Sequence, residues 1–503
     1  MDTRSIWQAL SPPADFPALE EDIAVDVAVV GGGITGVTTA LQLSRAARRV
    51  ALVEAHEIGC SATGGSTGNL YATVDEHLFR IKEKWDADTV KGVVQSRRSA
   101  IETIGRIVRE YGIDCGFGAR DWHLYATADA SADARDAVDH EYEVAREVGL
   151  EASLVDRLPL PFEIDRAVRI PGQAQLNPLA YVRGLARGLG DHCRIFEHTP
   201  ATGIDAKAGT VTTPRGAISA DAIVLATHTP KGVFMMQTAM QPAREYGLAA
   251  RLKANNYPEG IFWSADTPKH SIRSYAAGGE RYLMVIGLKH QTGKVQHTAD
   301  CYEQLESFTR KHFGIADIAW HWSAQHYRAG DMLPYIGESP RHENLYLATG
   351  FATDGLVYGT LAASIISDEI VGRDSRWGDL YKPSRFTPGK SAKQFVKQNL
   401  DVIAELAKKV TAADAGDWLD EVQPGEGRLI KTSGKKLAVY RDERGQVTVL
   451  GATCTHLGCD VHWNDAERTW DCPCHGSRFR LDGSVIEGPA LEPLKPQTIS
   501  PYS

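Results

Sequence analysis

Four residues near the end of the chain have the types and spacing of metal ligands. A Cys-x-His pair, Cys454 and His456, precedes a Cys-x-x-His pair, Cys472 and His475. Two thiolates and two imidazoles can hold a [2Fe-2S] cluster, with the cysteines on one iron and the histidines on the other. A structural zinc site is the alternative, because zinc also accepts mixed cysteine and histidine ligands. The pattern predicts either a redox cluster or a structural metal.

Each of the two loops carries a further cysteine, Cys459 in the first and Cys474 in the second. An extra cysteine in both loops is unusual for zinc. The segment 418–503 resembles Rieske [2Fe-2S] domains of the respiratory and ferredoxin kind, in which a disulfide ties the two cluster loops together. The resemblance implies a disulfide between Cys459 and Cys474 and a cluster bound by these ligands: Cys454, His456, Cys472 and His475.

Other residues of this segment match the surroundings of a Rieske cluster. Gly483 and the stretch 488–490 match the turn and the proline loop that shield it, and Ser477 matches the serine that donates to a bridging sulfide. High-potential members carry a tyrosine that bonds a ligand sulfur, where this chain has Phe479. One fewer donor stabilises the reduced cluster less, so we expect a potential in the middle of the Rieske range.

A cluster that accepts electrons requires a donor, and the N-terminal part of the chain offers one. An apolar run at 26–30 leads into a G-x-G-x-x-G turn at 31–36, and a second run at 50–53 ends in Glu54. Between a strand and a helix, with an acidic residue about twenty positions on, this turn is the dinucleotide fingerprint. The alternative is a glycine-rich turn in an unrelated α/β domain. The fingerprint alone does not separate NAD from FAD.

Later segments favour FAD. The stretches 59–69, 224–227, 331–337 and 344–355 resemble motifs of the glycine oxidase, sarcosine oxidase and D-amino-acid oxidase family, and the resemblance covers residues 20–375. It implies an α/β Rossmann-like FAD-binding domain with an interleaved mixed-sheet substrate domain, followed by the all-β Rieske domain. The residues implied to bind FAD are Gly31, Gly33, Gly36, Glu54, Ser61, Gly64, Asn69, Ala226, Thr227, Gly350, Phe351 and Gly355.

Three further stretches, 75–77, 287–293 and 322–325, resemble one subgroup: bacterial FAD oxidoreductases fused to a C-terminal Rieske domain. That subgroup is often labelled by analogy with γ-glutamylputrescine oxidase, a label that says little about the substrate.

The predicted organisation has three parts. Residues 1–375 form the FAD-dependent oxidoreductase, with a helical insert at about 90–150 and a strand-rich insert at about 240–330 that build the substrate domain. Residues 376–417 form a linker helix. The Rieske domain occupies 418–503.

Composition excludes several classes of protein. The chain has 503 residues and a net charge of -9, so nothing favours binding to nucleic acid or to an anionic membrane. The first 22 residues have no signal-peptide pattern and no long apolar run follows, so we expect a cytoplasmic protein without a transmembrane segment. Four scattered cysteines are expected to be reduced thiols: Cys60, Cys115, Cys193 and Cys301.

One set of residues imitates the two-histidine, one-carboxylate iron site of Rieske oxygenases: Asp317, His321, His326 and Asp331. Trp320 and Trp322 alternate as in a strand, which would place His321 and His326 on opposite faces. In the oxygenases the Rieske domain also precedes the iron domain, whereas here it follows a flavin domain. We therefore do not expect mononuclear iron.

The sequence leaves three classes of function. A dehydrogenase would pass electrons singly through the cluster to an external acceptor such as a ferredoxin or a cytochrome. A flavin reductase serving an oxygenase would need a second fingerprint for NAD(P)H, and the sequence has none. A redox sensor would use Cys459 and Cys474 as its switch. A complete substrate domain favours the dehydrogenase.

The family resemblance implies that a small amine or amino acid is oxidised at a C–N bond, and a 2-hydroxy acid is the alternative substrate. The flavin supplies the chemistry, so the protein need only orient the substrate and move a proton. The candidate catalytic residues are His77, His290, Gln325 and Tyr327. His290 is favoured because an imidazole can accept the ammonium proton near neutral pH; alternatively it only bonds loop backbone. Arg244 and Arg273 are candidates for a substrate carboxylate.

Overall fold

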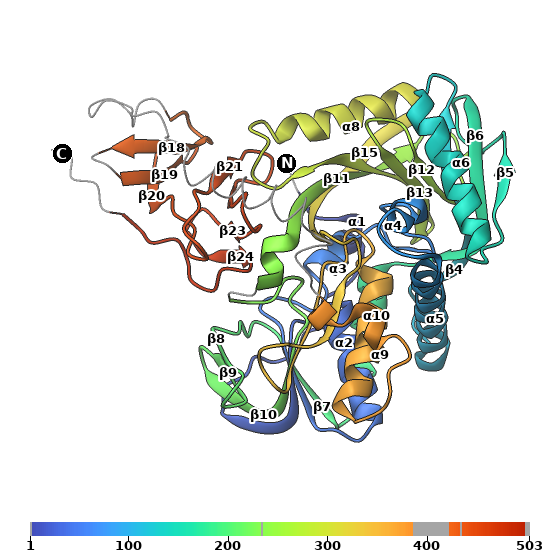
Figure 1. Cartoon of the computed structure of the whole chain (residues 1–503). Helices are drawn as coiled ribbons and strands as arrows, with labels where there is room; N and C mark the ends of the chain where they lie inside the picture. Colours follow the sequence, from blue (N-terminus) through green and yellow to red (C-terminus); the bar gives the residue numbers. More distant parts are fainter. Residues whose placement is uncertain (1–2, 233–234, 386–421, 433–434, 498–503) are drawn as a thin grey trace.

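The structure is a computed structural model that describes residues 3–232, 235–385, 422–432 and 435–497. Two large sheets share the chain before residue 385, and the C-terminal strands lie to one side of them (Figure 1). The predicted linker helix at 376–417 lies mostly outside the described residues. Its described part contains only the short helix α10, Gly378–Tyr381, and the 3-10 turn η2, Pro383–Arg385.

The first sheet has eight strands and carries the dinucleotide fingerprint. Its main order is β16-β17-β10-β1-β2-β7, and the strands from β17 to β7 run parallel. Its strands are β1 Ile23–Val30, β2 Val50–Val53, β7 Cys193–Phe196, β8 Gly203–Asp205, β9 Thr210–Thr213, β10 Gly216–Leu225, β16 Tyr335–Glu338 and β17 Leu345–Thr349. β1 and β2 are apolar because both of their faces are buried, one against helices and the other in a cluster made mostly of strand residues.

The second sheet has nine strands in the main order β15-β11-β14-β13-β12-β4-β6-β3, with β5 beside β6. It mixes parallel and antiparallel pairs, as the predicted substrate domain requires. Its strands are β3 Asn69–Leu70, β4 Gly118–Thr127, β5 Ser153–Val155, β6 Ile164–Gln175, β11 Met240–Leu252, β12 Ile261–Ser264, β13 His270–Ala277, β14 Glu280–Gln291 and β15 Ile315–Ala329. The long strands β11 and β15 pair along their whole length and form the edge of this sheet next to the C-terminal strands (Figure 1).

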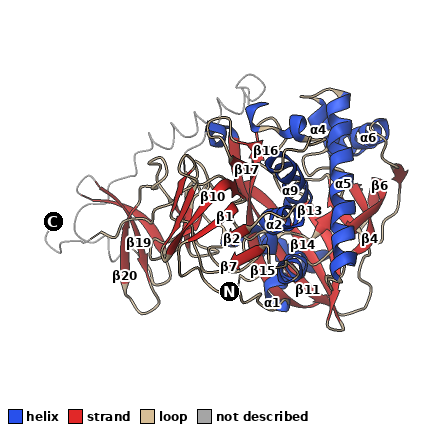
Figure 2. Cartoon of the chain, turned by 90° about the horizontal axis from the view of Figure 1, so that it is seen from below, coloured by secondary structure: helices blue, strands red, loops and turns tan. Residues whose placement is uncertain are grey.

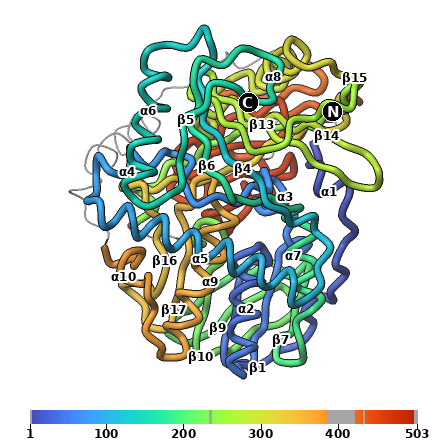
Figure 3. The backbone as a smooth tube through the Cα atoms, turned by 90° about the vertical axis from the view of Figure 1, so that its right-hand side faces the viewer, coloured from blue at the N-terminus to red at the C-terminus, as the bar shows by residue number. Residues whose placement is uncertain are grey.

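The helices pack around both sheets (Figure 2). They are α1 Ile6–Leu10, α2 Ile34–Arg45, α3 Ala62–Gly65, α4 Leu78–Lys82, α5 Ala87–Tyr111, α6 Ala132–Glu147, α7 Pro178–Arg187, α8 Ala299–His312 and α9 Gly355–Ile370, with a 3-10 turn η1 at Met235–Ala239. In Figure 3, α5 runs beside α9, which in turn packs on α2.

The insert predicted as helical at about 90–150 also contains a strand. α5 begins at the N-cap Asp86, whose side chain accepts a hydrogen bond from Thr89 N, and ends at Gly112 with φ 59°. β4 follows and pairs with β6 before α6 begins. The alternation of Trp122, Leu124 and Ala126, all buried on one side, marks this strand, but two amphipathic helices flank it and dominate the periodicity of the region.

Every described element after residue 422 is a strand. Three strands form one small sheet and four form another. They are β18 Gly427–Thr432, β19 Lys435–Arg441, β20 Val447–Gly451, β21 His462–Asn464, β22 Thr469–Asp471, β23 Arg478–Phe479 and β24 Val485–Glu487. This matches the predicted all-β C-terminal domain. Among the described residues, we find no helix with the length and apolar character needed to cross a membrane.

Candidate functional site

A cavity of about 440 Å³ opens at the carboxyl ends of the parallel strands. The turn after β1 forms one wall, where α2 begins at Gly33 without a side-chain cap. Because the first N–H groups of a helix have no partner within it, this terminus suits a phosphate. A second helix, α9, also begins at the cavity, with Gly355 in its wall and no side-chain cap at Asp354.

The polar groups around the cavity fit FAD. Glu54, at the end of β2, lines it and accepts hydrogen bonds from Gly32 N at 2.7 Å and from His56 N at 2.9 Å. Burial raises the pKa of Glu54. The hydroxyls of Ser66 and Thr353 also lie in the wall, buried and without a partner among the described residues. A dinucleotide can satisfy such groups, because buried polar atoms are normally hydrogen-bonded.

The residues predicted to bind FAD divide into two sets. The first set lines the cavity: Gly31, Gly33, Glu54, Ser61, Ala226, Thr227, Phe351 and Gly355. The second set lies behind the wall: Gly36, Gly64, Asn69 and Gly350. A Cβ at position 36 would lie 1.9 Å from Gly31 O, so this glycine lets α2 approach β1. Both amide atoms of Asn69 are buried without a partner among the described residues.

The two loops that carry the predicted cluster ligands meet at the edge of the C-terminal strands. The structure joins Cys459 and Cys474 by a disulfide with a Cα–Cα distance of 6.5 Å. The rings of His456 and His475 lie 5.0 Å apart between centroids. Cys454 and Cys472 are buried, free thiols, and the pKa of Cys454 is lowered to about 7, first of all by Cys472. Two adjacent thiols and two adjacent imidazoles fit a [2Fe-2S] cluster.

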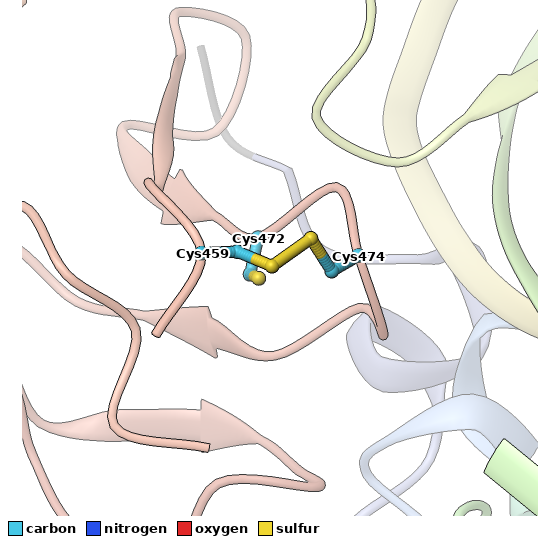
Figure 4. Close-up of side chains that lie close together, drawn as sticks. All are labelled: Cys459, Cys472 and Cys474. Carbon is cyan, nitrogen blue, oxygen red and sulfur yellow. A yellow bond between two sulfur atoms is a disulfide. The ribbon is translucent and has the colours of Figure 1, made fainter. Parts of the chain in front are cut away.

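Figure 4 shows Cys472 beside the disulfide. The sulfur atoms of Cys459, Cys472 and Cys474 lie within 4.8 Å of one another. A three-cysteine metal site would nevertheless require thiolates, and two of these sulfurs are bonded to each other. The free thiol of Cys472 therefore belongs with Cys454. Ser477 lies beside them, fully buried, and its hydroxyl accepts a hydrogen bond from Ala490 N at 3.1 Å.

The second cluster loop is hydrogen-bonded directly to the wall of the cavity. Gln325, which lines the cavity, donates from Nε2 to Gly476 O at 2.8 Å and to Tyr327 Oη at 2.8 Å. The Tyr327 hydroxyl lies 3.1 Å from Gly488 O in the proline loop. His228, also in the wall, lies 2.8 Å through Nδ1 from the Glu487 carboxylate. The same cavity is therefore bounded by both parts of the chain.

An ion network holds the two parts together. Arg244 on β11 is fully buried. It donates hydrogen bonds to Ser323 on β15 and to Glu467 of the C-terminal domain. Glu467 also pairs with Arg478, which donates from Nε to Asp471 at 3.1 Å. Burial acts to raise the pKa of Asp471, but Arg478 and Arg244 outweigh it and lower this pKa. Removing one member of such a network should destabilise the contact between the two parts, because it leaves a buried charge without its partner.

A cluster of charges on the other side of the second sheet brings two of the three subgroup stretches together. Lys289 Nζ lies 3.1 Å from Asp75 and 3.0 Å from Glu76. Glu76 also pairs with Arg328 at 2.7 Å. Burial acts to raise the pKa values of Asp75 and Glu76, and the neighbouring cations, Lys289 first, outweigh it and lower both. Leu288 has φ 58° beside the bulge that offsets β14 from β11 near Lys289.

Comparison with known proteins agrees with this geometry. A family model described as FAD dependent oxidoreductase matches residues 26–369, and a model described as Rieske [2Fe-2S] domain matches residues 418–498. The Bacillus subtilis (strain 168) protein YhfW, described as a Rieske 2Fe-2S iron-sulfur protein, is 34% identical over 498 residues, which cover 97% of this chain and 96% of YhfW. The chain belongs to the FAD dependent oxidoreductase family. It carries a C-terminal Rieske domain and uses FAD and a [2Fe-2S] cluster.

Solved structures share the fold of the FAD part. Glycine oxidase from Geobacillus kaustophilus has a TM-score of 0.60 at 19% identity, over 72% of this chain and 99% of that one. L-proline dehydrogenase from P. horikoshii has a TM-score of 0.59 at 18% identity, over 74% of this chain and 99% of that one. At these identities the likeness concerns the fold alone.

Two residues of this FAD dependent oxidoreductase that sequence reasoning did not assign to catalysis line the cavity. They are Glu245 on β11 and His326 on β15, and the residues around His326 in the sequence indicated only an iron ligand. Burial raises the pKa of Glu245 to about 7 and lowers the pKa of His326 well below its ordinary value. Glu245 follows Arg244 directly in a polar stretch of sequence, so its residue type gave no signal that it faces the cavity.

The four residues of the imitation iron site do not come together. His321 lies 2.7 Å from Glu306 on α8, on the face of β15 opposite His326, as the strand alternation predicted. Asp317 pairs with Arg251, and Asp331 with Arg385.

Other predicted site residues lie away from the cavity. His290 stands on the face of β14 opposite Lys289, with Nε2 3.1 Å from Tyr246 Oη and Nδ1 3.0 Å from Gln291 O. His77 Nε2 lies 3.0 Å from Lys269 Nζ. Arg273 is buried and donates to Thr67 O at 2.5 Å. Among the described residues that line the cavity, neither His290 nor either candidate arginine, Arg244 or Arg273, is present.

Proposed function

We propose that this oxidoreductase is a dehydrogenase of a small amine. It oxidises the substrate at a C–N bond and passes the electrons one at a time through the Rieske cluster to an external one-electron acceptor, such as a ferredoxin or a cytochrome.

The direct hydrogen bond from cavity-lining Gln325 to Gly476 O of the cluster loop carries this proposal. It supports a short route between the two cofactors within one chain. The names of two proteins of the same fold, glycine oxidase and L-proline dehydrogenase, support an amino compound as the substrate.

Each part of the chain has a role in this proposal. Bound FAD supplies hydride acceptance, and the cluster accepts single electrons. The turn after β1 and Glu54 hold the dinucleotide, and the second-sheet wall of β11 and β15 positions the substrate. The proposed cluster ligands are Cys454, His456, Cys472 and His475.

Photochemical reduction of the flavin under anaerobic conditions tests the electron route without any substrate. We expect the electron paramagnetic resonance signal of a reduced Rieske cluster to appear as the flavin bleaches. A cluster that stays oxidised while the flavin is fully reduced would contradict the proposal. NADH in place of light should leave the flavin oxidised, whereas rapid bleaching by NADH would favour a reductase.

A further inference from the structure

Glu245 differs from the other acids on its side of the second sheet. Asp75 and Glu76 are paired with Lys289 and Arg328. Glu245 lies in the cavity wall and has no hydrogen-bond or ion-pair partner among the described residues. Glu245 is half-buried, and Lys289 and Lys269 act on its carboxylate only through space. A carboxylate withdrawn from water without a bonded partner is stabilised by a ligand that pairs with it.

His326 is an independent sign that a ligand belongs at this place. Its side chain is only 5% exposed, it lines the cavity, and both ring nitrogens are buried without a partner among the described residues. β11 and β15 pair antiparallel, with Ala243 opposite His326 and Glu245 opposite Ala324. Glu245 and His326 are therefore diagonal neighbours on one face of the sheet.

The cations near this part of the cavity already have partners. Lys289 bonds two carboxylates, and Lys269 contacts His77. Arg244 faces the Rieske domain and Arg273 donates to backbone, so neither candidate for a substrate carboxylate is free to bind one. Among the described residues, the part of the cavity wall that β11 and β15 form therefore presents an unpaired acid and no lysine or arginine, whereas Lys231 and Arg480 line other parts of the cavity.

We propose that Glu245 binds the ammonium group of a cationic amine substrate and accepts its proton, with His326 as the second polar contact, and that the substrate has no carboxylate beside the reacting carbon. This inference rests on the proposed function and names the substrate class of the same site.

The chemistry balances as a proton transfer. One N–H bond of the substrate ammonium breaks, an O–H bond forms on Glu245, and the freed lone pair remains on nitrogen. The two-electron oxidation of the neutral amine that follows is the reaction FAD supplies. A neutral amine is required because an ammonium nitrogen has no lone pair to form the C=N bond.

The pH dependence follows from the groups that face Glu245. These are Lys289 on β14, Asp75 and Glu76 before α4, Lys269 before β13, and His326 on β15. Burial raises the pKa of Glu245 to about 7. Its carboxylate form is therefore lost as the pH falls through about 7, and amine binding should weaken in that range. His326 stays neutral there because burial lowers its pKa.

The test uses the holoenzyme and three probes of similar size: n-butylamine, butyrate and 1-butanol. Each is added anaerobically, and the flavin spectrum reports binding or bleaching. We expect a response to n-butylamine that strengthens as the pH rises through about 7, and little response to butyrate or 1-butanol. Glu245→Gln should weaken the response to n-butylamine by roughly tenfold or more, since a charge-assisted bond is lost, and should flatten its pH dependence.

Two further variants keep the test decisive. Glu245→Asp retains the charge and should restore part of the affinity, whereas Glu280→Gln, at the exposed start of β14, should behave as wild type. Preference for butyrate, or an unchanged n-butylamine response in Glu245→Gln, would overturn the inference.

Failure of the proposed function is separable from this result. Light-driven transfer from flavin to cluster needs no amine, so it should proceed normally in Glu245→Gln. Loss of that transfer in the wild type would contradict the electron route while leaving the amine-binding result intact.

Discussion

The two faces of β15 serve two different sites. On one face Ala324 and His326 line the cavity, and Arg328 pairs with Glu76. On the other face the side chains of Ser323 and Tyr327 bond Glu467, Gly488 and Gly476 of the Rieske domain. Because successive side chains of a strand point to opposite faces, a shift of one position moves a residue from the substrate side to the cluster side.

The comparison shows why a single sheet can separate two chemistries and still connect them. The cavity face presents Glu245 and His326 to a ligand, while the outer face presents hydrogen bonds and ion pairs that fix a second domain. Gln325 and Ser323 belong to both, since they line the cavity and also bond residues of the Rieske domain. Substitutions on one face should therefore change substrate binding, and those on the other should change electron transfer.

The largest expected effect is removal of the cluster itself. Cys472→Ser should abolish transfer to a one-electron acceptor but leave reduction of the flavin by substrate close to normal, because the cavity face of β15 is untouched. Iron and sulfide assays should give two of each per wild-type chain, as a [2Fe-2S] cluster requires, and none in the variant. Peroxide formation from oxygen should stay slow in the wild type.

His462→Ala is the matched control, since His462 stands on β21 outside the two ligand loops, and it should keep the cluster. Because Arg478, Arg480, Ile486, Glu487 and Gly488 also line the cavity, loss of flavin from Cys472→Ser would mean that the cluster shapes the flavin site. Undiminished peroxide formation in the variant would make the Rieske domain a structural or regulatory appendage.

The cluster loops could be predicted from the sequence because their ligands are local. Cys454 and His456 are separated by one residue, and Cys472 and His475 by two, so spacing alone identifies the chemistry. The fingerprint after β1 is local in the same way. The fold of the FAD part could be predicted because several motifs spaced along the sequence resemble those of the glycine oxidase and D-amino-acid oxidase family.

The substrate wall could not be predicted in the same way, because it is built from contacts between distant segments. Glu76, Lys289 and Arg328 meet only when three parts of the chain pack together. His290 and Lys289 are neighbours in sequence, yet they stand on opposite faces of β14. Strand register decides which face of β14 each residue occupies, and the bulge beside Leu288 could not be predicted from residue types.

The next largest effect should come from the outer face. Arg244→Met removes the cation that joins β11 to Glu467 and leaves that carboxylate with less compensation. We expect a loss of about 3 kcal/mol in stability or domain docking, since breaking a buried pair costs several kcal/mol, and slower reduction of the cluster after photoreduction of the flavin. The melting temperature and the rate of cluster reduction measure these effects.

Arg468→Met is the control for Arg244→Met. Its pair with Glu443, at 3.1 Å, is exposed, so its loss should change stability by less than about 1 kcal/mol. If Arg244→Met weakened n-butylamine binding as much as Glu245→Gln does, the two faces would not be functionally separate.

The smallest expected effect leaves both faces of β15 intact and changes the cluster alone. Phe479 is fully buried in the same apolar core as Cys454 and Cys472. In Phe479→Tyr the added hydroxyl can donate to a ligand sulfur and stabilise the reduced cluster. A hydrogen bond worth about 1 kcal/mol more in the reduced state raises a one-electron potential by about 40 mV. Protein-film voltammetry measures this shift.

Phe479→Leu, which adds no donor, should not raise the potential. A shift of zero or below in Phe479→Tyr would show that position 479 does not reach a ligand sulfur, and the potential would then depend on the groups around Ser477.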